Sequence, residues 1–225
     1  MKAEQKRAEK IFELLKAEYP EVKPALEFSS PFQLLIATIL SAQCTDARVN
    51  IVTSSLFKKY KKPQDFVSAA NEELEKDIFS TGFYKQKTKS IKQCCQKLVD
   101  EYNGKVPKDF EALTNLPGVG RKTASVVIGN AFGIPAIAVD THVKRLSNLL
   151  GFIESDDPTK IEARLKELLP EKEWINSSHW LAAHGRKVCI ARKPKCDLCV
   201  IGSLCPAFNP LSGVKPITKK SKKGI

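Results

Sequence analysis

Four cysteines near the C-terminal end constrain this chain more than any other feature. Cys189, Cys196, Cys199 and Cys205 follow the spacing C-x6-C-x2-C-x5-C, in a sequence whose first residues lack the apolar stretch of a secretion signal. Such clustering indicates a metal site and not a disulfide framework. Four thiolates can hold a tetrahedral zinc ion or a cubane iron–sulfur cluster. Only one pair has the short spacing of a structural zinc site, which favours iron–sulfur and leaves zinc as the alternative.

The rest of the chain has the apolar spacing of helices. Residues such as Ala8, Ile11 and Leu15 recur every three or four positions, and a helix is expected over residues 31–40. The segment GIPAIAV (133–139) resembles a strand, but its proline and the lack of a partner run predict an extended crossover. With 42% hydrophobic residues in 225, the chain can bury one large core or two ordinary ones. We therefore expect an all-α fold with two lobes joined by this crossover.

The charge balance favours a polyanionic partner. The net charge is +12, and the five lysines of the tail at 211–225 account for less than half of it, so the body is basic as well. The tail itself is expected to be solvated and disordered. No apolar run approaches the roughly 20 residues that a bilayer requires. A soluble, cytoplasmic protein with no membrane partner is expected.

A helix-hairpin-helix is predicted at about residues 109–130, where the tight turn LPGVG separates two helical segments. Gly118 and Gly120 have no Cβ, so the backbone can approach another backbone and direct its amides outward to phosphate oxygens. The alternative is an ordinary turn between packed helices. A nucleotide-binding phosphate loop fails on spacing, because Arg121 separates Gly120 from Lys122 and no strand precedes the turn.

Two residues that follow this turn have side chains that could take part in catalysis. Lys122 stands in the first turn of a helix with Arg121 beside it, and the helix dipole and the like charge both favour the neutral amine. A neutral lysine is a candidate imine-forming nucleophile, and the alternative is a solvated surface lysine. Asp140 ends the crossover and is a good N-cap for the next helix. The same carboxylate can face a developing cation.

A second basic feature lies between the first two cysteines of the cluster. Arg192, Lys193 and Lys195 fall in one short loop, which we expect to be exposed and to contact phosphates. His179 and His184 are five residues apart, on different faces of a helix, which argues against a helical metal pair.

Taken together, the motifs LPGVGRKTA, VDTH and HGRKVCIARKPKCDLC, followed by Cys205, resemble the endonuclease III family of helix-hairpin-helix DNA glycosylases. The resemblance covers about residues 3–206 and rests on three independent motifs in the expected order and at the expected separations. It implies an all-α, two-lobed fold. The implied parts are a six-helix barrel with the hairpin at 24–134, a discontinuous [4Fe-4S] cluster domain at 1–23 and 135–210, and a lysine-rich tail at 211–225 that has no counterpart in the family.

The resemblance also implies roles for particular residues. Lys122 corresponds to the nucleophile, Asp140 to the catalytic carboxylate, and the four cysteines to the cluster ligands. Gln43, in SAQCTD, would fill the space left by an extruded base, and Phe83, in TGFYK, would act as the opposing wedge. Many relatives have leucine at the latter position, and the alternative is an ordinary buried phenylalanine. The remaining expected DNA contacts are His142, near the flipped nucleotide, and Gly118, Gly120, Arg121, Arg192, Lys193 and Lys195.

The implied function is a monomeric, bifunctional DNA glycosylase and abasic-site lyase of base excision repair. Its implied substrate is double-stranded DNA with oxidised pyrimidines or abasic sites. The implied location of the protein is the cytoplasm, with the chromosomal DNA. One alternative is an adenine-type mismatch glycosylase, which would lack Lys122 and carry a further C-terminal domain. The other is a non-catalytic iron–sulfur DNA-binding protein, which would leave an abasic strand intact.

Overall fold

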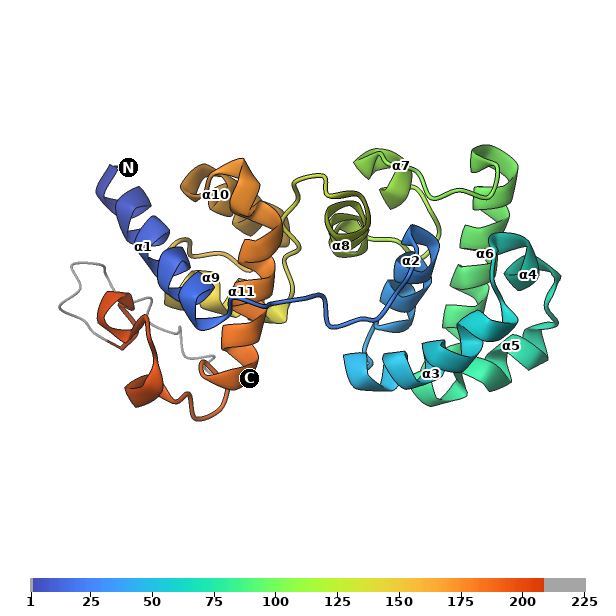
Figure 1. Cartoon of the computed structure of the whole chain (residues 1–225), viewed down its shortest axis with the longest axis horizontal. Coiled ribbons are helices and arrows are strands. Elements are labelled where there is room, and N and C mark those ends of the chain that lie inside the picture. Colours follow the sequence, from blue (N-terminus) through green and yellow to red (C-terminus); the bar gives the residue numbers. More distant parts are fainter. Residues whose placement is uncertain (1, 209–225) are drawn as a thin grey trace, which may run out of the picture. The chain divides into compact units, whose positions relative to one another are not determined.

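The computed structural model describes residues 2–208, and every regular element in that range is a helix (Figure 1). The prediction of an all-α chain is confirmed. The chain divides into two compact units, one formed by Met1–Lys23 with Ile137–Ile225 and the other by Pro24–Ala136. The predicted tail at 211–225 lies outside the described residues. Within residues 2–208, no helix is both long and apolar enough to cross a bilayer.

The unit Pro24–Ala136 is built around α2, whose residues are almost all buried. This helix begins where the sequence predicts, because Pro31 fixes the first turn and the hydroxyl of Ser30 accepts a hydrogen bond from the amide of Gln33. It packs against α3, α6 and α8. The helices of this unit are α2 (Pro31–Leu40), α3 (Asp46–Lys59), α4 (Pro63–Ser68), α5 (Asn71–Ile78), η1 (Phe79–Thr81), α6 (Tyr84–Tyr102), α7 (Phe110–Thr114) and α8 (Arg121–Phe132).

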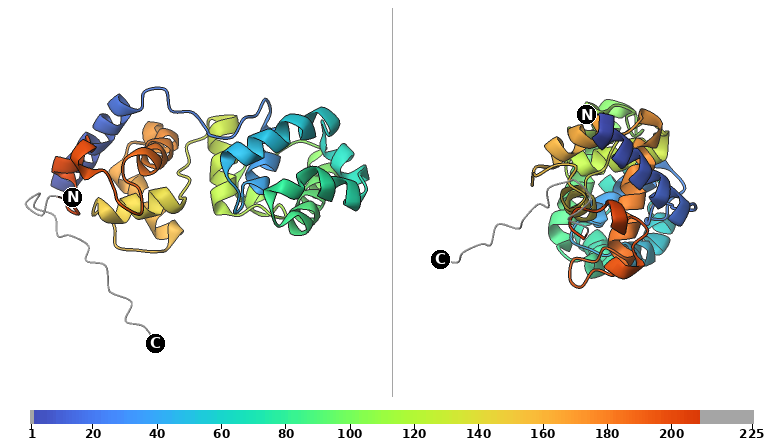
Figure 2. Two further views of the ribbon diagram at one scale, coloured as in Figure 1. Left: turned by 90° about the horizontal axis from the view of Figure 1, so that it is seen from below. Right: turned by 90° about the vertical axis from the view of Figure 1, so that its left-hand side faces the viewer.

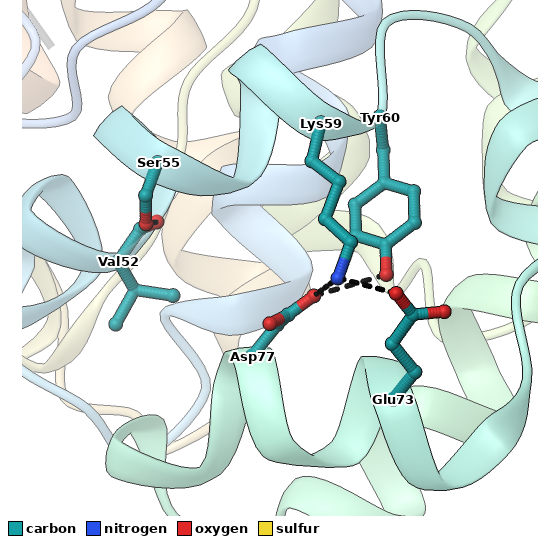
Figure 3. Close-up of polar contacts among 6 residues, drawn as sticks. All are labelled: Val52, Ser55, Lys59, Tyr60, Glu73 and Asp77. Carbon is teal, nitrogen blue, oxygen red and sulfur yellow. Dashed lines mark hydrogen bonds and ion pairs between the residues drawn. The ribbon is translucent and has the colours of Figure 1, made fainter.

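Ion pairs attach the end of α3 to α5 (Figure 3). Lys59 Nζ lies 2.6 Å from Asp77 Oδ2 and 2.7 Å from Glu73 Oε1, and Tyr60 donates its hydroxyl to the same Asp77 oxygen at 2.9 Å. The hydrogen bonds to Asp77 and Glu73 raise the pKa of Lys59. Helix α5, which precedes Phe83 in the chain, is thereby fixed to α3.

The other unit joins the two ends of the described chain. Helix α1, buried along Ala8, Ile11 and Leu15, packs against α10 and α11 (Figures 1 and 2). Residues 133–140 connect the Pro24–Ala136 unit to this one without strand pairing, as the sequence predicts. Its helices are α1 (Lys2–Glu18), α9 (Thr141–Leu149), α10 (Pro158–Leu168), η2 (Glu171–Glu173), α11 (Trp174–Lys187), η3 (Cys196–Leu198) and η4 (Gly202–Leu204).

Candidate nucleic-acid interface and metal centre

The predicted hairpin is present, with α7 and α8 on either side of a tight turn. Val119 N donates to Leu116 O at 3.1 Å and closes this turn. Gly118 has φ of +78°, and a Cβ at this position would lie 2.8 Å from the Cβ of Ser90 on α6. Both its conformation and its packing therefore require glycine.

Gly120 differs from Gly118 in its surroundings. Its φ is −90°, and a Cβ there would meet no heavy atom of the described residues within 4 Å. The protein's own packing does not require glycine here, and the backbone faces open surface. No backbone hydrogen bond among residues 2–208 uses the amide of Gly118 or Gly120. Together with the first amides of α8, which have no acceptor within the helix, they are free donors of the kind that can bind an anion.

Arg121 and Lys122 are the first two residues of α8, and both are exposed. The guanidinium carbon of Arg121 lies 4.9 Å from the ring centroid of Phe110, so this side chain packs back against α7. Lys122 stands at the surface directly after the hairpin turn. An amine in this place is accessible to a bound DNA strand.

Asp140 caps α9, as predicted. Its Oδ1 accepts the amides of His142 and Val143, both at 2.8 Å. The side-chain hydrogen bonds of the described residues leave Oδ2 unused. The carboxylate is thus fixed in orientation by one oxygen while the other stays available to a cation. Asp140 and Lys122 belong to different units of the chain.

His142 lies in the first turn of α9 and has an unusual neighbour. Its Nδ1 is 3.3 Å from a guanidinium nitrogen of Arg145, which also donates to Cys189 O at 2.7 Å. Burial lowers the pKa of His142, and the cations of Arg145 and Arg186 lower it further, against the opposing charge of Asp140. A neutral imidazole can exchange hydrogen bonds with a nucleotide but does not attract its phosphate as a charge.

Gln43 and Phe83 share an unusual backbone conformation. Both are non-glycine residues with positive φ, 53° for Gln43 and 48° for Phe83. Phe83 is 65% exposed, which excludes the alternative of an ordinary buried phenylalanine. Left-handed backbone at large, exposed side chains is uncommon and tends to occur at functional sites. Phe79, 63% exposed and packed on Tyr84, is a further exposed aromatic that the sequence analysis missed.

The four cysteines of the cluster lie close enough for their charges to interact. Burial raises the pKa of Cys189 to about 11, Arg145 opposes this rise, and the other three cysteines add to it. Among residues 2–208, no three Cys, His, Asp or Glu side chains are grouped so that they could hold one metal ion. A single zinc would need its ligand atoms within about 2.3 Å of the metal.

Side chains from distant parts of the sequence surround these cysteines. The buried His184 places Nε2 at 3.4 Å from Cys199 Sγ and Nδ1 at 3.0 Å from the hydroxyl of Tyr19. Arg7 donates from Nη1 to the carbonyl of Leu204 at 3.1 Å, while its buried Nε and Nη2 have no hydrogen-bond partner. These orphaned donors fit an anionic group bound at the cysteines. The sequence argued only against a helical metal pair at His184 and did not indicate these contacts of His184, Tyr19 or Arg7.

The basic loop of Arg192, Lys193 and Lys195 is exposed, as predicted. Lys195 N donates to Val188 O at 3.0 Å, which closes the loop at its base, and Lys193 has φ of 61°. Within the described part of the chain, none of these three side chains forms an ion pair or a hydrogen bond. Their charges are thus available to phosphates.

Comparison with known proteins agrees with this geometry. Residues 36–171 match the family described as HhH-GPD superfamily base excision DNA repair protein. Residues 189–205, from the first to the last cysteine of the cluster, match the iron–sulfur binding domain of endonuclease III, which confirms the predicted iron–sulfur site.

Similar proteins cover nearly the whole chain. Endonuclease III of Synechocystis sp. is 48% identical over 208 residues, which is 92% of this chain and 95% of the relative. The structure of a trapped endonuclease III–DNA covalent intermediate has a TM-score of 0.88 at 45% identity, covering 91% of this chain and 96% of that chain. A thermostable thymine-DNA glycosylase has a TM-score of 0.83 at 26% identity, covering 92% and 98% of the two chains.

Proposed function

This chain belongs to the endonuclease III family of the HhH-GPD superfamily of base excision DNA repair proteins, and on that premise we propose that it is a bifunctional DNA glycosylase and abasic-site lyase. Its proposed substrate is double-stranded DNA with oxidised pyrimidines. The observation that carries the proposal is the exposed Lys122 directly after a turn suited to hold a phosphate backbone.

The proposed reaction begins at the sugar of the damaged nucleotide. The neutral amine of Lys122 attacks C1′, the bond from C1′ to the base breaks, and the base leaves with a proton. The C1′–O4′ bond then breaks and opens the sugar ring, with O4′ taking up a proton, which leaves an imine between C1′ and Nζ that acidifies the protons on C2′. Loss of one of them breaks the C3′–O bond by β-elimination, which cleaves the strand on the 3′ side. The trapped covalent intermediate known for an endonuclease III with DNA supports a covalent route.

Asp140 has a proposed role in the first step. As the base leaves, positive charge develops on the sugar, and the unbonded Oδ2 of Asp140 can stabilise that charge. It can also assist proton transfer. The two N–H bonds to Oδ1 hold the carboxylate in one orientation, so little reorganisation is needed when the charge appears.

The other predicted residues bind and distort the DNA in this proposal. Chemistry at C1′ requires the damaged nucleotide to leave the base stack. Gln43 would fill the vacated space, Phe83 would wedge from the opposite side, and His142 would contact the extruded nucleotide. The exposed side chains and left-handed backbones of Gln43 and Phe83 support their assignment.

We assign the cluster ligands to Cys189, Cys196, Cys199 and Cys205. The [4Fe-4S] cluster would supply an anionic cross-link that fixes the segment and its basic loop, and base release needs no chemistry from it. The proposed protein acts as a monomer in the cytoplasm, with the chromosomal DNA.

Borohydride trapping on duplex DNA with one oxidised pyrimidine tests the central assignment. Lys122→Gln keeps hydrogen bonding but cannot form an imine, so the trapped complex and strand cleavage should be lost while binding of lesion DNA remains. Lys61→Gln, at an exposed lysine of the same unit, is the matched control and should trap normally. A normal yield of trapped complex from Lys122→Gln would mean that another amine is the nucleophile.

Two further substrates separate the alternatives. Strand cleavage at a pre-formed abasic site excludes a non-catalytic DNA-binding protein. Removal of adenine opposite an oxidised guanine, with no action on oxidised pyrimidines, would replace the proposal by an adenine-type glycosylase.

A further inference from the structure

Arg7 on α1 reaches the segment that carries the last cysteine of the cluster. Its Nη1 donates to the carbonyl of Leu204, the residue before Cys205, at 3.1 Å, although the two residues are 197 positions apart. Its guanidinium carbon lies 5.4 Å from the ring centroid of Phe152. The side chain is therefore held in a fixed place by α1, an aromatic ring and one carbonyl.

The rest of this guanidinium lacks partners. Nε and Nη2 are both buried and form no hydrogen bond. No ion pair involving Arg7 is present among the described residues, and Glu4, the acid one turn earlier, pairs instead with Arg164 at 2.7 Å. Buried, unpaired donors cost free energy, and a buried charge without a counter-charge costs more. Such a group calls for an anion or an acceptor in its surroundings.

A [4Fe-4S] cluster would give Arg7 both a negative charge and hydrogen-bond acceptors. Four thiolate charges exceed the charge of the iron–sulfur core, so the ligated cluster is an anion with several sulfur acceptors. We infer that Arg7 is a positioning residue of the cluster site, whose guanidinium offsets the cluster charge and donates hydrogen bonds to sulfur at Cys205 or the core. This inference rests on the proposed cluster ligands and is independent of the chemistry of Lys122.

A buried water is the main competing partner for the two donors. Water could accept both hydrogen bonds, but it would add no negative charge at the guanidinium beyond the through-space effect of Glu4. The two cases differ in their effect on the cluster. A nearby cation stabilises the more reduced, more negative state and so raises the reduction potential, whereas a water-satisfied structural arginine would leave the potential dependent on packing alone.

The experiment uses the anaerobically purified, iron-loaded protein and measures the midpoint potential of the cluster together with iron and sulfide per chain. Arg7→Gln removes the charge and keeps an amide donor, and Arg7→Lys keeps the charge and loses the planar fork. Arg164→Gln, in the same unit but paired with Glu4 and Glu167, is the matched control. Circular dichroism checks that each variant is folded.

We expect Arg7→Gln to favour the oxidised cluster about tenfold at a fixed potential, a negative shift of ~59 mV for a one-electron couple. Arg7→Lys should retain most of the wild-type potential, and Arg164→Gln should match the wild type. If Arg7→Gln cannot retain iron, retention by both Arg7→Lys and Arg164→Gln supports the inference.

Two outcomes overturn it. One is an unchanged potential in a folded, iron-loaded Arg7→Gln protein, and the other is loss of iron or an equal shift in Arg7→Lys. A wild-type protein without iron would instead refute the assigned cluster ligands, so the two failures are distinguishable.

Discussion

A single substitution can separate the capping role of Asp140 from its proposed role as a charge. Asp140→Asn keeps an oxygen to accept the amides of His142 and Val143 but removes the negative charge. Base release from lesion DNA should then fall by roughly 10² to 10⁴ fold, the usual size of electrostatic and proton-transfer effects. On a pre-formed abasic site, where no base must leave, the variant should keep more activity. Gel assays of base release and strand cleavage measure the two steps.

Asp157 offers a matched control at the same scale. It caps α10 by accepting the amide of Thr159 at 2.8 Å, and Asp157→Asn alters an equivalent cap without touching the proposed site. Its base release should match the wild type. Equal losses in Asp157→Asn and Asp140→Asn would show that Asp140 acts through helix stability alone.

The sequence predicts the roles of residues that interact with their neighbours in the chain, and it does not predict contacts between distant residues. The cap by Asp140 and the glycine at position 118 follow from local rules of helix and turn geometry. The donation from Arg145 to Cys189 spans 44 positions and that from Arg7 to Leu204 spans 197. Those contacts depend on which helices pack together, and no local pattern encodes that.

At the scale of elements, the hairpin turn contains two glycines with different demands. Gly118→Ala places a Cβ against Ser90 and forces a left-handed alanine, so it should lower the free energy of unfolding by about 1–3 kcal/mol. Gly120→Ala adds a methyl into open space and should change stability by less than about 1 kcal/mol. Urea denaturation measures both.

Gly120→Ala, which should barely change stability, should nevertheless lower the affinity for DNA. The Cβ of Gly120→Ala would occupy the surface where a phosphate backbone must approach the amides, so this stable variant should bind lesion DNA more weakly. Wild-type affinity in Gly120→Ala would show that the strand does not contact the turn there.

The basic loop is a second element with a measurable charge role. If Arg192 contacts a phosphate, Arg192→Ala should flatten the slope of log K against log salt by about one, without changing lesion preference. Lys160→Ala, at an exposed lysine of α10 in the same unit, should leave the slope unchanged. A slope that Arg192→Ala does not alter would indicate a solvated loop.

At the scale of the molecule, the sequence predicted a helical chain in two parts linked by the crossover at 133–139. The two units of the structure divide after Lys23 and after Ala136. The second division lies two residues beyond the end expected for the barrel domain, residue 134. Periodicity locates the helices because each helix buries one face. It does not predict that α1 packs against α10 and α11, because an apolar face shows that a helix is covered but not which helix covers it.

The two units have separate cores, which makes the effect of cluster loss predictable. The core with α1, α10 and α11 includes Ile201 from the cysteine segment, whereas the core of Pro24–Ala136 contains no residue of that segment. Cys199→Ser removes a proposed ligand, so metal-linked folding free energy is lost in one unit. Amide hydrogen exchange should accelerate in α1, α11 and residues 189–208 and stay unchanged in α2 to α8.

Cys94→Ala, at a buried cysteine outside the cluster, should retain full iron and show the reverse pattern, with faster exchange only in its own unit. Equal acceleration of both units in Cys199→Ser would mean that the chain unfolds as one cooperative body.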